Sequence, residues 1–380
     1  MASEGMRLLD FVVGIHDPRV IGRTDHDLVD ILVLALCAVM AGADGWDDIE
    51  DWGLENEAML REYLRLRNGI PGHDTIRRVF ELLEPNEVEL RFADWVSHVC
   101  PAVEGRVIAI DGKSVRGSGS VLRGVKALHL VSAYATEVGV MLAQQRCEEK
   151  SNEITAIKAL LPSLALKGAI VTIDAMGCQR AIAQTIVTQG GDYLLSVKDN
   201  QPKLHEAIQE YFAIAQAEDF RHVEPDVSET LDKGHGRLET RRCTVVAAPT
   251  YLEELARWKE VRALVKIEAR REWGGKVETE TRYAITSLAP NATQILRAAR
   301  LHWGIENGFH RCLDVAFRED ASAIRLRNAA ANFALLRRFA LNLFRLDKSS
   351  TKSLPKKRKA AAWNPRYLGE LLNLQPLQEI

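Results

Sequence analysis

Two apolar segments in the middle of the chain each run directly into an aspartate, and this pattern constrains the fold more than any other feature. The segments are Val107–Asp111 and Ile170–Asp174, and their unbroken apolar character predicts strands that are buried on both faces of a sheet. A carboxylate that follows a buried strand lies at the rim of the sheet, where water or a cation must satisfy its charge. If the two strands are neighbours, the two aspartates lie together.

Acidic and basic residues are distributed unevenly along the 380 residues. Residues 1–100 hold nine arginines, no lysines and 20 acids, a balance of −11, whereas residues 297–366 hold 16 basic residues and five acids, a balance of +11. The total charge of −2 therefore hides a polarised molecule. A basic region of this density suits a polyanion, although a solvated helical face would show the same pattern.

Length and composition indicate a globular protein of two or three domains, since 380 residues exceed one core of ordinary size and 47% are hydrophobic. The six cysteines form no C-x-x-C pair, which disfavours zinc ribbons and disulfide frameworks and favours a reducing compartment. The most apolar stretch, residues 28–43, contains Asp30 and is too short to span a bilayer, and no cleavable signal precedes it. We therefore expect no membrane association and a cytoplasmic location with access to the nucleoid.

The first hundred residues predict short helices separated by glycine turns. One helix is expected to begin near Asp25 or Thr24 and to end at Gly42, and another to begin at His73 with Asp74 as its cap. Such helices allow a helix-turn-helix DNA-binding unit, whose contacts would be Thr75, Arg77 and Arg78. The acidic balance argues against this role, and a helical scaffold or dimerisation module explains the pattern equally well.

From Gly105 onward the apolar period changes to that of strands. The expected strands are Val107–Asp111, His129–Thr136, Val138–Cys147, Ala169–Asp174 and Asp192–Val197, with helices over Asn152–Leu161 and Gln179–Gln189. Three leading strands, the last two joined as a hairpin, are thus followed by alternating helices and strands. This order predicts an α/β fold with a ribonuclease H-like mixed sheet and helices on both faces.

The pattern departs from this plan after Lys198. Further strands are expected over His235–Pro249, Val261–Trp273 and Lys276–Leu288, and an apolar helix over Ala321–Leu346 closes the core. The predicted parts are an all-helical N-terminal domain (1–100), a catalytic core (101–200 and 290–347), a β-rich insertion (201–289) and a basic C-terminal segment (348–380).

Glu306, in a helix-patterned segment 132 residues after Asp174, is the candidate for a third acid. Taken singly, Asp111 before Gly112 is explained as a turn former, Asp174 as a helix cap and Glu306 as a solvated residue. Taken together, carboxylates gathered at one sheet edge repel one another unless a cation neutralises them. Three such acids are the minimum needed to hold two magnesium ions for cutting and rejoining phosphodiester bonds.

The helix around Glu306 carries polar groups every four residues, namely His302, Glu306, His310 and Asp314. A zinc site is the competing interpretation, but the spacing is not that of H-E-x-x-H. We expect instead that His302 and His310 approach the scissile phosphates or orient Glu306. The alternative third ligands are Asp314, Glu319 and Asp320.

Four basic residues are candidates for holding a DNA backbone near the metals, and they are Lys113, Arg116, Lys198 and Arg237. Two tryptophans in or beside the insertion, Trp258 and Trp273, could form an aromatic wall for a stacked base, although a tryptophan is more often ordinary core.

Eight segments resemble a known family. They are Ala43–Ile49, Asn68–Thr75, Ile110–Arg116, Lys150–Ile154, Thr172–Gln179, Lys198–Pro202, His235–Arg242 and His302–Asn307. In their order and their residues, these segments resemble the H-repeat-associated, ISAs-type insertion-sequence transposases of the DDE superfamily. The resemblance extends over nearly the whole chain. The resemblance implies a helical N-terminal domain, a nuclease core with a β-strand insertion, and Asp111, Asp174 and Glu306 as the catalytic, metal-binding acids.

The same resemblance implies two Mg²⁺ ions, with Mn²⁺ as a substitute, terminal inverted repeats and target DNA as partners, and a homo-oligomer assembled on DNA. The chain departs from the pattern beside Glu306, where His302 and Leu313 stand in place of the arginine and lysine of related DDE enzymes. It also has Phe309-His310-Arg311 where Leu-His-Trp is expected. Two other functions stay open: a nuclease of the same fold without strand transfer, and a non-catalytic DNA-binding relic.

Overall fold

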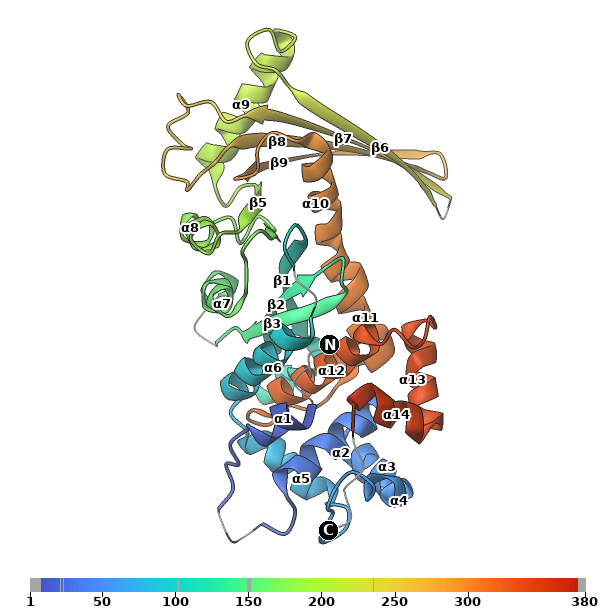
Figure 1. The fold of residues 1–380 in the computed structure, drawn as a ribbon. Coiled ribbons are helices and arrows are strands. Elements are labelled where there is room, and N and C mark those ends of the chain that lie inside the picture. The colour runs from blue at the N-terminus through green and yellow to red at the C-terminus, as the bar shows by residue number, and fades with distance from the viewer. Residues whose placement is uncertain are drawn as a thin grey trace, which may run out of the picture.

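The computed structural model describes residues 8–374 apart from 21, 23, 101–102, 149–151 and 235. These residues form an elongated molecule with three parts along its length (Figure 1). The helices of the first hundred residues lie at one end, a mixed sheet lies in the middle, and four long strands with one helix form the other end. Residues 1–7 and 375–380, at the ends of the first and last predicted parts, lie outside the described residues.

The described residues up to Val99 are helical, as predicted. Their helices are α1 (Leu8–Val13), α2 (Leu28–Ala41), α3 (Trp46–Glu55), α4 (Glu57–Leu60), α5 (His73–Leu82) and α6 (Pro85–Val99). Helix α2 is almost wholly buried and ends at Gly42, whose φ of +135° favours glycine. Its N-cap is Asp27 rather than Thr24 or Asp25. Helix α5 begins after Gly72, so Asp74 lies in its first turn and is not its cap.

The central sheet begins with the order β3-β2-β1-β4-β5. Its strands are β1 (Val107–Val115), β2 (Leu128–Ala135), β3 (Val140–Arg146), β4 (Ile170–Ile173) and β5 (Asp192–Val197), and the helices between them are α7 (Glu153–Leu160) and α8 (Arg180–Thr188). Strand β2 is antiparallel to β1 and β3, whereas β1, β4 and β5 are parallel. This is the ribonuclease H-like arrangement, so the predicted α/β class is confirmed.

Strand β1 corrects the prediction at Asp111. We expected the strand to end at this aspartate, but it continues to Val115 because β2 supplies ladder partners as far as the Val115–Leu128 pair. Strand β4 on the other side stops at Ile173. Asp111 therefore lies within β1 and at the rim of only the parallel part of the sheet.

The insertion extends the same sheet to nine strands, because β9 pairs with β5 in antiparallel fashion. Its elements are α9 (Pro202–Ala217), β6 (Asp226–Gly234), β7 (Arg237–Ala247), β8 (Ala263–Trp273) and β9 (Lys276–Thr286). Strand β6 was not predicted because it is a largely exposed edge strand without apolar alternation. Helix α9 was also missed, although Leu204, Ile208 and Phe212 recur at helical spacing. The first of the three strands expected after Lys198 begins at Arg237 rather than His235, and His235 lies outside the described residues.

After the insertion the chain returns to the core as helices. They are α10 (Ala292–Gly304), a π-helical turn (Ile305–His310), α11 (Arg311–Phe317), α12 (Ala329–Leu346), α13 (Leu354–Trp363) and α14 (Pro365–Leu372). Helix α12 begins at Ala329 rather than Ala321 and packs against α2, α5 and β3, so it joins the N-terminal helices to the sheet. In the basic run of α13, Lys357 is buried and donates to the Phe344 carbonyl at 2.9 Å.

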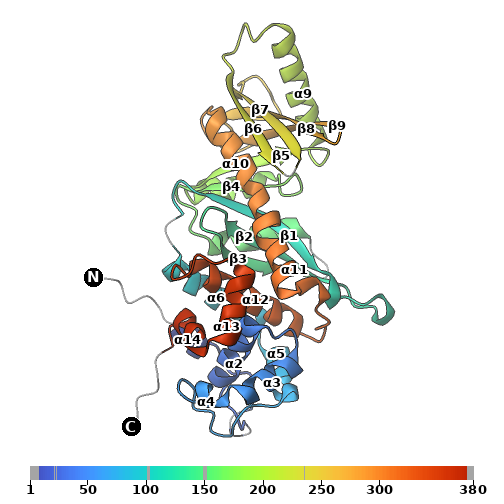
Figure 2. The same cartoon turned by 90° about the vertical axis from the view of Figure 1, so that its right-hand side faces the viewer.

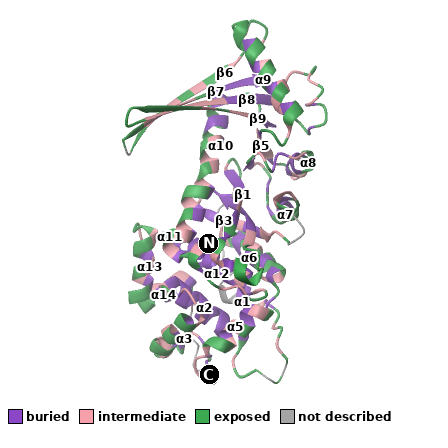
Figure 3. Ribbon diagram, turned by 180° about the vertical axis from the view of Figure 1, so that it is seen from behind, coloured by how far each residue is buried: buried purple, intermediate pink, exposed green. Residues whose placement is uncertain are grey.

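Helices cover both faces of the central sheet, as the sequence predicts. Ile108 and Ile110 of β1 share a core with α7 and α8, whereas Val107 packs with the residues of α10 on the opposite face. Buried residues fill α2, α12 and the central strands, while the free ends of β6 and β7 are exposed (Figure 3).

Among the described residues no single helix has the length and apolar character to cross a membrane, although α2 and α3, bent by 94° relative to each other, pass that test as a pair.

Candidate active site

Asp111 and Asp174 lie side by side because of the strand register. In the parallel ladder Ile110 pairs with Ile173, and an aspartate follows each of these partners. Neighbouring strands lie about 4.8 Å apart. Asp174 also closes the turn after β4, since its Oδ1 accepts hydrogen bonds from the backbone N–H groups two and three residues later, at 3.0 and 3.3 Å. Its capping role and its place beside Asp111 are therefore compatible.

Glu306 approaches the sheet from the π-helical turn between α10 and α11. Turns of this kind recur at functional sites. Packing fixes the turn, because the ring of Phe309 stacks on Tyr134 of β2 with centroids 5.1 Å apart. The Glu306 side chain itself is exposed.

The electrostatic environment of Asp111 links the three predicted acids. Burial raises the pKa of Asp111 to about 7, and nearby negative charges act in the same direction. Those charges belong to Asp174, Glu306 and Glu153. Carboxylates at the end of β4 and on the π-helical turn thus act on Asp111 of β1, together with a fourth acid that the sequence analysis did not assign.

The donor chemistry of this group suits a hard divalent cation, because Mg²⁺ prefers carboxylate oxygens and clustered carboxylates repel one another without a cation. As the side chains stand, no three acidic, histidine or cysteine side chains in the described part of the chain are close enough together to hold a metal ion. The same finding applies to the zinc site considered at His302 and His310. Asp174 and Glu306 are therefore within electrostatic range of Asp111, but the three side chains are not arranged as a metal site.

The two histidines near Glu306 face different groups. His302 Nδ1 lies 3.0 Å from Thr172 Oγ1 in β4, and burial lowers the pKa of this ring. His310 Nδ1 lies 3.7 Å from Asp111 Oδ2. Burial lowers the pKa of His310 to about 3, so its ring is neutral at pH 7, and its buried Nε2 has no hydrogen-bond partner among the described residues. His310 therefore lies beside the acids, while His302 fixes the helix to β4.

Lys113 corrects a sequence expectation, because its ammonium group points into the protein. Its Nζ lies 2.8 Å from Asp314, 2.9 Å from Asp320 and 3.7 Å from Glu319, and its side chain is only 9% exposed. Burial lowers the pKa of Lys113, but these carboxylates outweigh burial and the pKa is raised. Lys113 is therefore a largely buried cation that is paired with three carboxylates. The three acids considered as alternative third ligands are its partners.

The other basic candidates are exposed but widely separated. Arg116 follows β1 and its side chain is 84% exposed, with Nε 3.4 Å from Asp320. Lys198 is exposed directly after β5. Arg237 lies at the turn between β6 and β7, at the end of the extension that points away from β1 (Figure 1).

Helix α5 presents little free basic surface for DNA recognition. Arg77 pairs with Asp74 at 2.9 Å and with Glu81 at 2.7 Å, and Thr75 is partly buried. Of the three contacts considered, Arg78 is the exposed one. DNA recognition by this helix stays a prediction.

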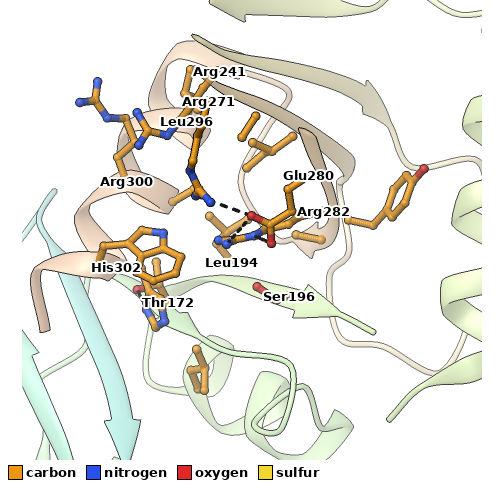
Figure 4. A pocket seen from close by; sticks show the side chains of 17 residues that line it. Thr172, Leu194, Ser196, Arg241, Arg271, Glu280, Arg282, Leu296, Arg300 and His302 are labelled. Atoms are coloured by element: carbon orange, nitrogen blue, oxygen red, sulfur yellow. Dashed lines mark hydrogen bonds and ion pairs between the residues drawn. The ribbon is translucent and has the colours of Figure 1, made fainter. Parts of the chain in front are cut away.

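A pocket next to Thr172 and His302 is lined by arginines (Figure 4). It lies between α10 and strands β8 and β9 and has an empty volume of about 740 Å³. Its arginines are Arg241, Arg271, Arg282 and Arg300. The carboxylate of Glu280 lies between two of them, 2.7 Å from Arg282 and 3.6 Å from Arg271.

Trp303 supplies the aromatic wall of this pocket, and the sequence analysis did not assign it. The guanidinium of Arg282 lies 4.7 Å from the centre of its ring, and the side chain is 37% exposed. Trp258, only 5% exposed, is ordinary core, and Trp273 lies at the outer end of β8. The position of Trp303 directly after His302 was the signal that could have identified it.

The sequence analysis also missed a hydrogen-bonded group of three side chains, Ser114, His129 and Glu153, which lies beside Gly112. His129 Nε2 lies 2.6 Å from Glu153 Oε1, and its Nδ1 lies 2.8 Å from Ser114 Oγ. A Cβ at Gly112 would lie 2.4 Å from Glu153 Oε1 and 2.8 Å from His129 Nε2, so glycine leaves the room that this pair occupies beside Asp111. Strand register pairs Ser114 with His129, but the contact with Glu153 depends on how α7 packs.

Comparisons with known proteins identify relatives over most of the chain. A family described as "Transposase DDE domain" matches residues 103–343, and one described as "DDE_Tnp_1-associated" matches residues 9–96. "Putative transposase YncI" of Escherichia coli O157:H7 is 41% identical over 369 residues, covering 96% of this chain and 94% of that protein. "H repeat-associated putative transposase YhhI" of Escherichia coli strain K12 is 39% identical over 371 residues, covering 96% and 97%.

Among solved structures, a piggyBac transposase synaptic complex with hairpin DNA aligns with a TM-score of 0.43 and 9% identity, covering 96% of this chain and 78% of that chain. This similarity is too low to bear on the site. The family match and the two bacterial relatives, by contrast, span both the helical part and the core. The chain therefore belongs to the DDE transposase family, among the H repeat-associated transposases.

Proposed function

We propose that the protein cuts DNA at the ends of an insertion element and joins the released 3′ ends to target DNA, with Asp111, Asp174 and Glu306 as catalytic carboxylates. The observation that carries this proposal is that strand register brings Asp174 beside Asp111 and that the charges of Asp174 and Glu306, from distant parts of the sequence, act on Asp111. Acids gathered in this way at one sheet edge are typical of metal-dependent phosphodiester chemistry.

The three carboxylates would hold two Mg²⁺ ions, or Mn²⁺ in their place, and these ions when bound supply an activated water or 3′-hydroxyl and stabilise the leaving oxygen. Mutual repulsion of the carboxylates favours binding of such cations. His310 stays neutral at pH 7, so it adds no positive charge beside Asp111. His302 holds α10 against Thr172 and thereby positions the turn that carries Glu306.

DNA is the partner of this site, with terminal inverted repeats and target DNA as its substrates. Arg116 and Lys198 are exposed at the ends of β1 and β5 and suit phosphate contacts near the acids, whereas Arg237 would contact DNA farther away. Trp303 and the arginines around it offer a ring face and positive charge to a terminal nucleotide. Joining two element ends requires two active sites, which favours a homo-oligomer on DNA.

The test uses wild-type protein and a duplex that carries the inverted repeat bordering the gene together with its flanking DNA. Nicking at the repeat boundary is expected with Mg²⁺ or Mn²⁺ and not with EDTA. A pre-cut end should be joined to a plasmid, which distinguishes a transposase from a nuclease of the same fold. Binding without nicking or joining would identify the non-catalytic relic instead.

Gly112→Ala is expected to slow nicking about 10²-fold while the protein stays folded, because displacements near 1 Å have such effects at active sites. The new Cβ must displace Glu153 and His129 beside Asp111. Gly234→Ala is the matched control, since among the described residues a Cβ there would meet no atom within 4 Å beyond Gly234 itself and its chain neighbours. Nicking rates and melting temperatures of both variants check this, and equal rates would refute the role of the His129–Glu153 pair.

A further inference from the structure

The loop between β1 and β2, residues 116–127, projects from the body of the protein with a closed tip (Figure 2). Ser120 and Val125 exchange two backbone hydrogen bonds of 2.8 and 3.0 Å, and Gly124 completes the turn at φ +63°. The base of the loop is also fixed, because Arg325 Nε donates to a loop carbonyl at 3.0 Å. The tip is therefore held in a defined shape.

Val121 and Leu122 occupy this tip, and their side chains are 100% and 101% exposed. Single exposed apolar residues are common on folded proteins. Here two adjacent ones bury no surface against the described residues, so they contribute nothing to the core. An apolar pair presented on a closed turn is suited to insertion into another molecule.

The loop itself carries only basic charges. The sequence holds no acidic residue between Asp111 and Glu137, and Arg116, Arg123 and Lys126 are all exposed on the loop. DNA complements such a loop, because its phosphates attract the cations and its base steps admit apolar wedges.

A groove runs from the loop to residues that neighbour the acids. It has an empty volume of about 1760 Å³, and its lining extends from Lys126 to Glu153 and Met176. The charge of Glu153 acts on Asp111, and Met176 lies two residues after Asp174. DNA in this groove would pass beside the loop and beside Glu153 and Met176, the neighbours of Asp111 and Asp174.

We propose that Val121 and Leu122 form a wedge that enters the DNA and unstacks a base step beside the cleaved phosphate. The inference rests on the proposed function and specifies how that site engages duplex DNA. Unstacking bends the duplex and frees the backbone at the step to be cut.

The test compares wild type with the double variant Val121→Ser, Leu122→Ser on a duplex that carries the element end and 2-aminopurine at successive positions across the boundary. Ca²⁺ replaces Mg²⁺ so that the DNA is bound and not cut. Wild type should raise the fluorescence at one position through unstacking, and the double variant should lose this rise. With Mg²⁺ the variant should nick paired ends about 10-fold more slowly or worse, but should nick an end mismatched at that step at the wild-type rate.

Leu231→Ser is the matched control, because Leu231 is 66% exposed in β6, and it should behave as wild type. Asp111→Asn should keep the fluorescence rise without nicking, which separates failure of the wedge from failure of the proposed function. Equal fluorescence and nicking by wild type and the double variant would overturn the wedge. The wedge would also be overturned if the double variant changed only the oligomeric state, as measured by light scattering. That result would assign the tip to a contact between copies of the chain.

Discussion

Asp111→Asn is expected to slow DNA nicking by about 10³-fold or more with either Mg²⁺ or Mn²⁺, because bound metal ions supply several kcal/mol of transition-state stabilisation. The amide keeps the size of the side chain but lacks the charge that attracts a cation. Binding of the end duplex should be nearly unchanged, since Asp111 is not a phosphate contact. Single-turnover nicking and a parallel binding titration measure the two effects separately.

Asp199→Asn is the matched control, because it removes the same charge from a fully exposed side chain just after β5. It should nick at the wild-type rate. Asp174→Asn and Glu306→Gln should resemble Asp111→Asn. Nicking retained by any of these three variants would remove that residue from the catalytic set.

The Asp111→Asn protein should also be more stable than wild type without metal. Burial raises the pKa of Asp111 to about 7 from the ordinary 3.8, so the wild-type fold loses stability as the pH rises from about 4 to about 7 and keeps the full deficit above pH 7. Asparagine has no such deficit. In EDTA the melting temperature of the variant should be higher at pH 8 and nearly equal at pH 4, and a lower value at pH 8 would disprove the buried-carboxylate explanation.

The parts of the site that lie in local sequence patterns could be predicted. The apolar runs before Asp111 and Asp174 indicated two buried strands, and the order of strands and helices made those strands neighbours. Glu306 depended on the family resemblance, because helical periodicity does not distinguish a metal ligand from a solvated glutamate. The extent of β1 beyond Asp111 was missed since it depends on pairing with β2.

Contacts between distant segments could not be predicted from local patterns. Lys113 lies in a basic stretch and therefore resembled a DNA contact, but Asp314 and Asp320, its partners, follow some two hundred residues later. Arg338 belongs to the basic region 297–366, which suited a polyanion, yet its side chain has no exposed area. Burial of a long cation depends on a partner that only the tertiary fold supplies.

Arg338→Met is expected to destabilise the protein by about 3–5 kcal/mol, which is the usual effect of breaking a buried ion pair. Arg338 pairs with Glu319, which is equally buried, and donates to the carbonyl of Ala334 at 2.9 Å. Without the guanidinium, the Glu319 carboxylate loses its close partner, because Lys113 lies 3.7 Å from it but 2.8 Å from Asp314 and 2.9 Å from Asp320. Urea unfolding followed by circular dichroism measures the loss.

Two further variants separate an unpaired charge from lost packing. Replacing the pair together, with Arg338→Met and Glu319→Leu, should restore most of the stability because no charge stays buried alone. Arg257→Met makes the same change at an exposed arginine and should shift unfolding by less than about 0.5 kcal/mol. The restored double variant should still nick DNA slowly, because Arg338 lies 5.8 Å from the ring of Phe309 in the turn that carries Glu306. If the double variant were instead as unstable as Arg338→Met alone, the lost stability would come from packing within α12 and not from the unpaired carboxylate of Glu319.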